Sequence, residues 1–150
     1  MAYAAITAAR DTKLQGRDIV SLKMDAVKIY KGGLVCADAS AGYATHTPTA
    51  SRPFFGVAEE TVDNSTGSAG DKSIRVRTTG IHSFVAASAT QALVGTTVYW
   101  SSGSSGNNGT VVTSDPGIGC IVGRVVEVVS ATEVRVLIDN YAFNVDMQAS

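Results

Sequence analysis

The chain has 150 residues, of which 45% are hydrophobic and 17% are charged, and its formal net charge is −1. This length fits one domain with its own hydrophobic core. The near-neutral charge argues against a dedicated nucleic-acid binder, because such proteins usually carry a basic face. Few charges together with 15 glycines are typical of a turn-rich β protein.

Basic side chains concentrate near the N-terminus. Residues 1–31 carry a net charge of +3, whereas residues 32–150 carry a net charge of −4. Residues 1–17 show the hydrophobic period of neither a helix nor a strand, so we expect an extended arm that orders against a neighbour, with a disordered terminus as the alternative. The cations of this arm, Arg10, Lys13 and Arg17, are candidate contacts to a partner surface.

Alternating apolar and polar side chains follow the arm and predict a series of β-strands. The clearest alternation covers 73–79, where Ile74 and Val76 share one face and Arg75 and Arg77 share the other. The predicted strands cover residues 34–36, 54–60, 73–79, 81–86, 96–100, 111–112, 119–129 and 133–138. Residues 18–29 form either one long strand or a bent pair of strands, and residues 87–93 are compatible with one helical turn. Such a series of strands without a long helix indicates a barrel or a sandwich.

The two halves of the chain resemble one another weakly. Three pairs of segments correspond: Phe54-Phe55-Gly56 with Ile121-Val122-Gly123, Ile74-Arg75-Val76 with Val134-Arg135-Val136, and Gly33-Leu34-Val35 with Gly95-Thr96-Thr97-Val98. In the first pair, a glutamate follows the glycine by four positions in both segments: Glu60 follows Gly56, and Glu127 follows Gly123. We hypothesise that two similar β units pack around one core, and that the glycine in each strand permits a bulge or tight bend. Chance similarity between β-strands is the alternative.

Motifs of catalysis and cofactor binding are absent or weak in the sequence. We find no nucleophile elbow, Walker loop, zinc-protease helix or calcium loop. Cys36 and Cys120 lack metal-ligand spacing, and we interpret them as buried free thiols, with a disulfide as the alternative. His46 and His82 are each isolated and are interpreted as structural, although a Ser-His-Asp triad stays open because its members need not be close in sequence. We expect no enzymatic activity, no cofactor and no metal site.

Two clusters of side chains are candidate contact residues. Arg75 and Arg77 lie on a strand face without aromatic neighbours, so we interpret them as salt-bridge formers and not as a nucleic-acid platform. Tyr99 and Trp100 form an aromatic pair at a strand end. This pair is either an anchor of the core or a hot spot of an interface, since both residue types dominate such hot spots.

Polar loops and hydropathy complete the sequence-based picture. We predict that residues 103–109 form a flexible surface loop, and that Asn108-Gly109 makes a hairpin turn. No apolar stretch reaches the roughly 20 residues that a transmembrane helix needs. No signal-peptide pattern is evident at the N-terminus, so we expect a protein made in a reducing cytosol and without a membrane partner.

The order of several short motifs resembles that of the small capsid decoration (cement) proteins of tailed bacteriophages. These motifs are, in chain order, Gly56-Val57-Ala58-Glu59-Glu60, Ile74-Arg75-Val76-Arg77 followed by Gly80, the segment from Gly95 to Tyr99-Trp100, Ile121-Val122-Gly123-Arg124-Val125, and Val134-Arg135-Val136-Leu137-Ile138. The resemblance covers about residues 18–140 and depends on the order of motifs that are short and rich in Gly and Val.

The resemblance implies a small β-barrel or β-tulip-like domain over 18–140, with an extended N-terminal arm over 1–17 and a C-terminal tail over 141–150. It also implies a protein that is made in the bacterial cytoplasm and binds the outer surface of the mature head, where it stabilises contacts between major capsid protein subunits. Its partners would be the major capsid protein and two further copies of itself in a homotrimer. Arg10, Lys13, Arg17, Tyr99 and Trp100 are the candidate interface residues. Another virion structural role, as a head-fibre base or tail component, is the alternative.

Overall fold

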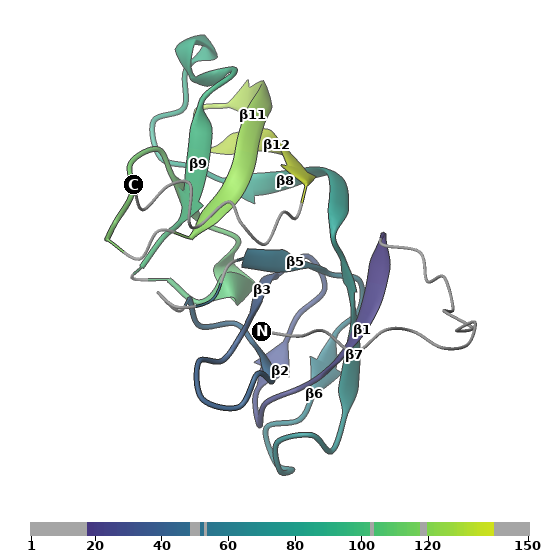
Figure 1. Ribbon diagram of the computed structural model, residues 1–150. Helices are drawn as coiled ribbons and strands as arrows, with labels where there is room; N and C mark the ends of the chain where they lie inside the picture. The colour runs from purple at the N-terminus through teal and green to yellow at the C-terminus, as the bar shows by residue number, and fades with distance from the viewer. Residues whose placement is uncertain (1–17, 49–51, 53, 103, 118–119, 140–150) are drawn as a thin grey trace, which may run out of the picture.

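The computed structural model describes residues 18–48, 52, 54–102, 104–117 and 120–139 (Figure 1). The fold is all-β and barrel-like, with a curled half-barrel sheet, which confirms the predicted fold class. The predicted arm over 1–17 and tail over 141–150 lie outside the described residues. The strands are β1 (Ile19–Lys23), β2 (Lys28–Ile29), β3 (Leu34–Ala37), β4 (Ala44–Thr45), β5 (Phe54–Ala58), β6 (Val62–Asp63), β7 (Ser73–Arg77), β8 (Thr79–Val85), β9 (Thr97–Trp100), β10 (Val111–Val112), β11 (Ile121–Ser130) and β12 (Glu133–Asp139).

Two five-stranded sheets make up most of the structure. The first has the strand order β1-β7-β5-β3-β4, and the second has the order β10-β9-β11-β12-β8. A short ribbon of β2 and β6 accompanies the first sheet. Only Thr78 separates β7 from β8, so one bent stretch of chain passes from the first sheet into the second (Figure 1). The helical segments among the described residues are two 3₁₀ turns, η1 (Gln91–Leu93) and η2 (Gly106–Asn108).

The two sheets have the same topology. When β8, β12, β11, β9 and β10 are matched to β1, β7, β5, β3 and β4, the neighbours in both sheets are the same. The register also agrees, because Val35 pairs with Gly56 in the first sheet and Val98 pairs with Gly123 in the second. Each of these strand pairs has an irregularity directly before its glycine. The structure therefore supports the hypothesis of two similar β units.

Polar contacts repeat in the two sheets as well. The N–H of Gly32 donates to the carbonyl of Ala58 at 2.8 Å, and the N–H of Gly95 donates to the carbonyl of Val125 at 2.8 Å. Two ion pairs also correspond, because Arg75 Nε lies 2.8 Å from Glu60 Oε2 and Arg135 Nη1 lies 3.1 Å from Glu127 Oε2. The prediction that Arg75 and Arg77 form salt bridges is confirmed, with Glu60 and Glu59 as their partners.

The hydrophobic core consists of two clusters, and the larger one joins both sheets. Side chains of β3 and β5 contribute to it from the first sheet, namely Leu34, Cys36, Phe54 and Val57. They pack against the inner face of the second sheet, which supplies Val98, Trp100, Val125, Val134, Val136 and Ile138. The smaller cluster lies on the opposite face of the first sheet and includes Met24, Ile29, Val35, Ile74 and Val76. The outer face of one unit thus covers the interior of the other.

The segment predicted as a flexible surface loop is instead packed against the first sheet. Gly106 is buried, and its N–H donates to the carbonyl of His46 at 2.6 Å. A Cβ atom on Gly106 would lie 2.7 Å from Trp100 Cζ2, so only glycine fits there. The predicted hairpin turn at Asn108-Gly109 is also wrong, because Asn108 ends η2 and residues 101–110 together connect β9 to β10.

Both cysteines are free and buried, which confirms their interpretation from sequence. Burial raises the pKa of the Cys120 thiol to about 12, and the Cys36 Sγ–H donates to the carbonyl of Thr47 at 3.0 Å. We predict that neither thiol reacts with an alkylating reagent at neutral pH in the folded protein, because the thiolate is the reacting species. Mass spectrometry after labelling, with an exposed thiol from Ser130→Cys as the positive control, checks this. Labelling of Cys120 in the native protein at the rate of that control would contradict it.

Asp38 organises the turn between β3 and β4. Its carboxylate accepts the backbone N–H groups of Ala41 at 2.7 Å, Ser40 at 2.9 Å and Tyr43 at 3.0 Å. These hydrogen bonds, above all that from Ala41, lower the pKa of Asp38 from 3.8 to about 2. The lowered pKa makes a stabilising contribution that is present above the unfolded-state pKa and is lost as the pH falls through about 2.

This pKa shift predicts a measurable acid sensitivity. We expect the thermal midpoint of the parent protein to fall between about pH 4 and about pH 2 partly because Asp38 becomes protonated, as its shift from 3.8 to about 2 requires. Asp38→Asn removes this titration, so the decline over the same pH range should be shallower. Thermal unfolding followed by circular dichroism checks the prediction. An equally steep decline in the variant would show that other carboxylates carry the effect.

Candidate interaction surface

Of the five residues predicted to lie at an interface, the structure describes two, and it places them on opposite faces of β9. Arg10, Lys13 and Arg17 fall outside the described residues. Trp100 is completely buried in the larger core cluster, with its ring edge-on to Phe54 at a centroid distance of 6.3 Å. Trp100 is therefore an anchor of the core, the first of the two alternatives. Tyr99 points to the opposite face of β9 and belongs to neither core cluster, but it is also buried, with 8% of its surface exposed.

The two histidines make hydrogen bonds within the domain. His46 Nδ1 lies 3.0 Å from Ser105 Oγ, and Ser105 also caps η2 by accepting the N–H of Asn107 at 3.2 Å. The pair fastens the loop between β9 and β10 to β4, which is a structural role. His82 Nε2 lies 3.1 Å from the carbonyl of Thr79, and its ring contacts Phe84. Sequence spacing could not reveal the His46–Ser105 contact, because 59 positions separate its members.

Strand β8 is the last strand of the second sheet, so one of its edges has no neighbouring strand among the described residues. The N–H of Ala86 donates to Thr132 on the β12 side, whereas the N–H of Val85 points away from β12 and donates to Gly109. Since backbone groups alternate along a strand, the N–H and C=O groups of Ile81 and Ser83 also point away from β12. Among the described residues, no strand pairs with β8 on that side, where Val85 forms an isolated bridge with Thr110. Such an edge can accept an extended segment of another protein.

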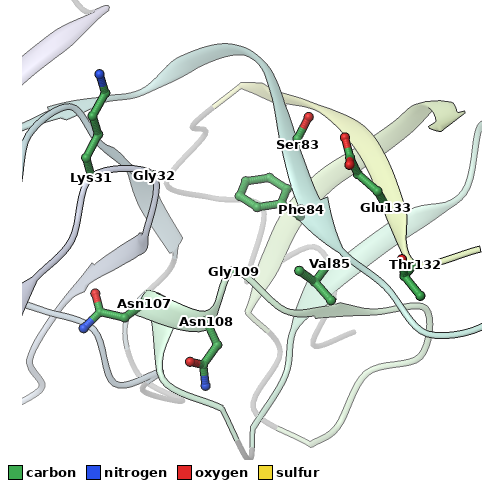
Figure 2. A pocket seen from close by; sticks show the side chains of 10 residues that line it. All are labelled: Lys31, Gly32, Ser83, Phe84, Val85, Asn107, Asn108, Gly109, Thr132 and Glu133. Atoms are coloured by element: carbon green, nitrogen blue, oxygen red, sulfur yellow. The ribbon is translucent and has the colours of Figure 1, made fainter. Parts of the chain in front are cut away.

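A groove lies along this edge, between β8 and the turn that precedes β3. Its larger recess has a volume of about 420 Å³, with β8 on one side and Lys31, Gly32 and η2 on the other. Figure 2 shows Phe84 at its centre and the amides of Asn107 and Asn108 at its lower rim. A smaller recess of about 140 Å³ shares Lys31 and Gly32 with the first. The groove is open and mixed in polarity, which suits a polypeptide contact better than an enclosed small-molecule site.

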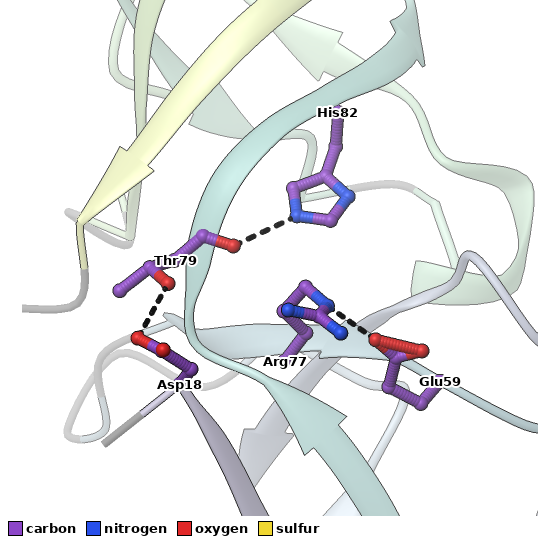
Figure 3. A network of polar contacts seen from close by, with 5 residues as sticks. All are labelled: Asp18, Glu59, Arg77, Thr79 and His82. Carbon is purple, nitrogen blue, oxygen red and sulfur yellow. Dashed lines mark hydrogen bonds and ion pairs between the residues drawn. The ribbon is translucent and has the colours of Figure 1, made fainter. Parts of the chain in front are cut away.

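A network of polar contacts lies where β7 bends into β8, and its members Glu59, Arg77 and His82 line the smaller recess (Figure 3). Thr79 Oγ1 donates to Asp18 Oδ1 at 3.1 Å, and the N–H of Thr78 donates to the carbonyl of Asp18 at 2.8 Å. On the opposite side of the strand, Arg77 pairs with Glu59 below His82. Asp139 pairs with Thr79, which also contacts Asp18, so the first and the last described residues lie at this corner.

The outer face of the second sheet carries exposed apolar side chains next to charged ones. Ile81 on β8 and Leu137 on β12 are directly opposite in the register and are 58% and 45% exposed. Arg124 on β11 neighbours Leu137 in the same row. Val126 and Val129 are exposed at two irregularities of β11. Neighbouring apolar residues within a polar surrounding are typical of protein contact surfaces.

No protein-family model matches this chain, and no curated protein matches it in sequence. Among the described residues, no group of three or more His, Cys, Asp or Glu side chains is placed to hold a metal ion. In the same part of the chain, no helix has the length and apolar character needed to cross a membrane.

Proposed function

We propose that this chain is a decoration protein, which binds the outside of the mature head of a tailed bacteriophage and clamps neighbouring major capsid protein subunits. The observation that carries the proposal is the contact surface around β8, with its open edge and the exposed pair Ile81 and Leu137. The order of motifs that resembles the decoration proteins gives independent support from sequence.

The proposed mechanism is stabilisation by preferential binding. A protein that binds only the mature shell lowers the free energy of that shell relative to its opened forms. Many copies on one shell add avidity, so each individual contact can be modest. Arg10, Lys13 and Arg17 would steer the arm towards an acidic capsid surface, which accelerates docking more than it strengthens the final complex. Formation of a homotrimer would place three such contact surfaces around one axis.

Cosedimentation with expanded heads, prepared from the encoding phage without this protein, tests the proposal. We expect the full chain to bind these heads and to raise the temperature at which they open. A variant with Ile81→Asp and Leu137→Asp should bind much more weakly, because two charges then face the contact. Val94→Asp alters another exposed hydrophobic residue, which lies outside the sheet, and serves as the control. No binding of the parent to heads, with binding to tails or fibres, would favour the alternative virion role.

Light scattering tests the oligomeric state and the role of the arm separately. We expect a particle of three 15.5 kDa chains for the full-length protein. If a chain without residues 1–17 still forms this particle but no longer binds heads, the arm serves capsid binding and not trimer formation. A strict monomer for both forms would contradict the homotrimer, and trimerisation would then require the capsid lattice.

A further inference from the structure

The groove beside β8 is bordered by backbone groups of the strand. The N–H of Val85 points away from β12 and donates to the carbonyl of Gly109. Because backbone groups alternate along a strand, the N–H and C=O of Ser83 point to the same side, towards the groove that this residue lines. In the described part of the chain, β8 has no contact with another strand there apart from the isolated bridge of Val85 with Thr110. An extended backbone is the partner that matches such donors and acceptors.

The two recesses of the groove follow one another along β8. Phe84 and Val85 line the larger recess, of about 420 Å³, and His82 lines the smaller one, of about 140 Å³. Lys31 and Gly32 border both recesses. Side chains that point to one face of a strand recur at every second residue, roughly 6.6 Å apart. A strand added beside β8 would therefore place alternate side chains in the two recesses.

The two recesses differ in charge and in size. Two cations, Lys31 and Arg77, and one carboxylate, Glu59, line the smaller recess, which leaves one formal positive charge in excess. Arg77 is paired with Glu59 (Figure 3), whereas Lys31 forms no ion pair with any described residue. A short acidic side chain complements this recess. The larger recess has room for a large side chain, which would contact the exposed Val85.

We propose that the groove binds an extended segment of another protein as an additional strand beside β8, with an acidic side chain in the smaller recess and a large apolar one in the larger. The source of the segment rests on the proposed function, under which it belongs to a capsid subunit. Hydrogen bonds to the backbone of Ser83 hold the segment, and the two recesses select its sequence. The added strand ends at Val85, whose N–H is already bonded to Gly109.

Fluorescence anisotropy with labelled peptides tests the groove of the full chain. The probes are Thr-Phe-Thr-Asp-Thr and Thr-Asp-Thr-Phe-Thr, because the order of the two inserted side chains depends on the direction of the segment. We expect one of them to bind the parent. Ser83→Pro removes the N–H that faces the groove and no hydrogen bond to β12, a change that edge strands accept. It should weaken binding about tenfold, the effect of one lost hydrogen bond. Ser83→Ala keeps the N–H and should bind like the parent.

Reversal of the charge at Lys31 gives a second test that leaves β8 unchanged. Lys31→Glu should weaken binding of the preferred peptide and strengthen binding of the same peptide with Lys in place of Asp. Lys23→Glu reverses an exposed lysine that lines neither recess, and it should leave both affinities unchanged. Circular dichroism checks that each variant is folded.

Two results overturn the inference: no binding of either peptide by the parent, or equal binding by Ser83→Pro and Ser83→Ala together with no effect of Lys31→Glu. Cosedimentation with heads separates this inference from the proposed function. If the parent and Ser83→Pro bind heads equally well, decoration stands without strand addition at β8. If the parent binds a peptide but no heads, the groove binds a strand and the proposed function is contradicted.

Discussion

Replacing Trp100 with alanine is expected to lower the free energy of unfolding by about 3–5 kcal/mol, the usual cost of removing a large buried aromatic side chain. Trp100 is fully buried, meets Phe54 edge-on at 6.3 Å and donates its Nε1–H to the carbonyl of Ser104 at 3.2 Å. Because Phe54 belongs to the first sheet and Trp100 to the second, the lost contacts include those that join the two sheets. Denaturant unfolding followed by circular dichroism measures the change.

Two further variants make this prediction specific. Val129→Ala removes an exposed side chain from the same sheet and should change stability by no more than about 0.5 kcal/mol. A double-mutant cycle of Trp100→Ala with Phe54→Leu should give a coupling of about 0.5–1.5 kcal/mol, as expected for an edge-on aromatic pair. A coupling near zero, or a loss for Trp100→Ala no larger than that of the control, would contradict the view that this pair joins the sheets.

The sequence allowed most of the long strands to be predicted, because their side chains alternate between core and solvent. The segment 73–79 illustrates this, since Ile74 and Val76 are buried while Arg75 is exposed in β7. The two-residue strands β4 and β6 lie outside the predicted strands. A segment of two residues is too short to show an alternation of apolar and polar side chains. The pairing of β4 with β3 is a consequence of tertiary structure.

The candidate interaction surface was much harder to predict than the strands. The open side of β8 depends on which strands pair in the second sheet, and an alternation pattern does not specify strand order. The groove depends on Lys31 and Asn107, which approach β8 from two distant loops. The prediction for the loop around Gly106 was wrong because it used local composition alone. A Gly- and Ser-rich segment is typical of a flexible loop, but the small residues of this one permit close packing.

The resemblance between the two halves was visible in sequence mainly through residues with a steric or electrostatic role. Gly56 and Gly123 sit at the same point of the register, and Glu60 and Glu127 each pair with an arginine of the adjacent strand. Residues on the outer faces have diverged, since Cys36 corresponds to Tyr99. The divergence follows from the different environments, because one face is covered by the second sheet and the other is not. The two halves thus share the strand pairing within each sheet, but they differ in the residues of the outer faces.

Gly123→Ala is expected to destabilise the protein by about 1–3 kcal/mol, the usual cost of forcing an extra methyl group into a packed site. A Cβ atom at this position would lie 2.8 Å from Val136 Cγ1 and would also press on the backbone carbonyl of Leu137. Since β11 and β12 are hydrogen-bonded neighbours, the carbonyl can retreat only if the strand pair distorts. Thermal and denaturant unfolding both report the loss.

The structural repeat predicts that Gly56→Ala has the same effect for the same reason. Its Cβ would lie 2.8 Å from Val76 Cγ1 and would press on the carbonyl of Arg77, so the two glycines meet equivalent atoms. Val126→Ala alters an exposed residue of β11 and should be nearly neutral. Because the two sites lie in different sheets and share no neighbour, the losses in the double variant should add within about 0.5 kcal/mol. A loss at only one glycine would mean that the two sheets tolerate the same distortion differently, and would contradict their equivalence.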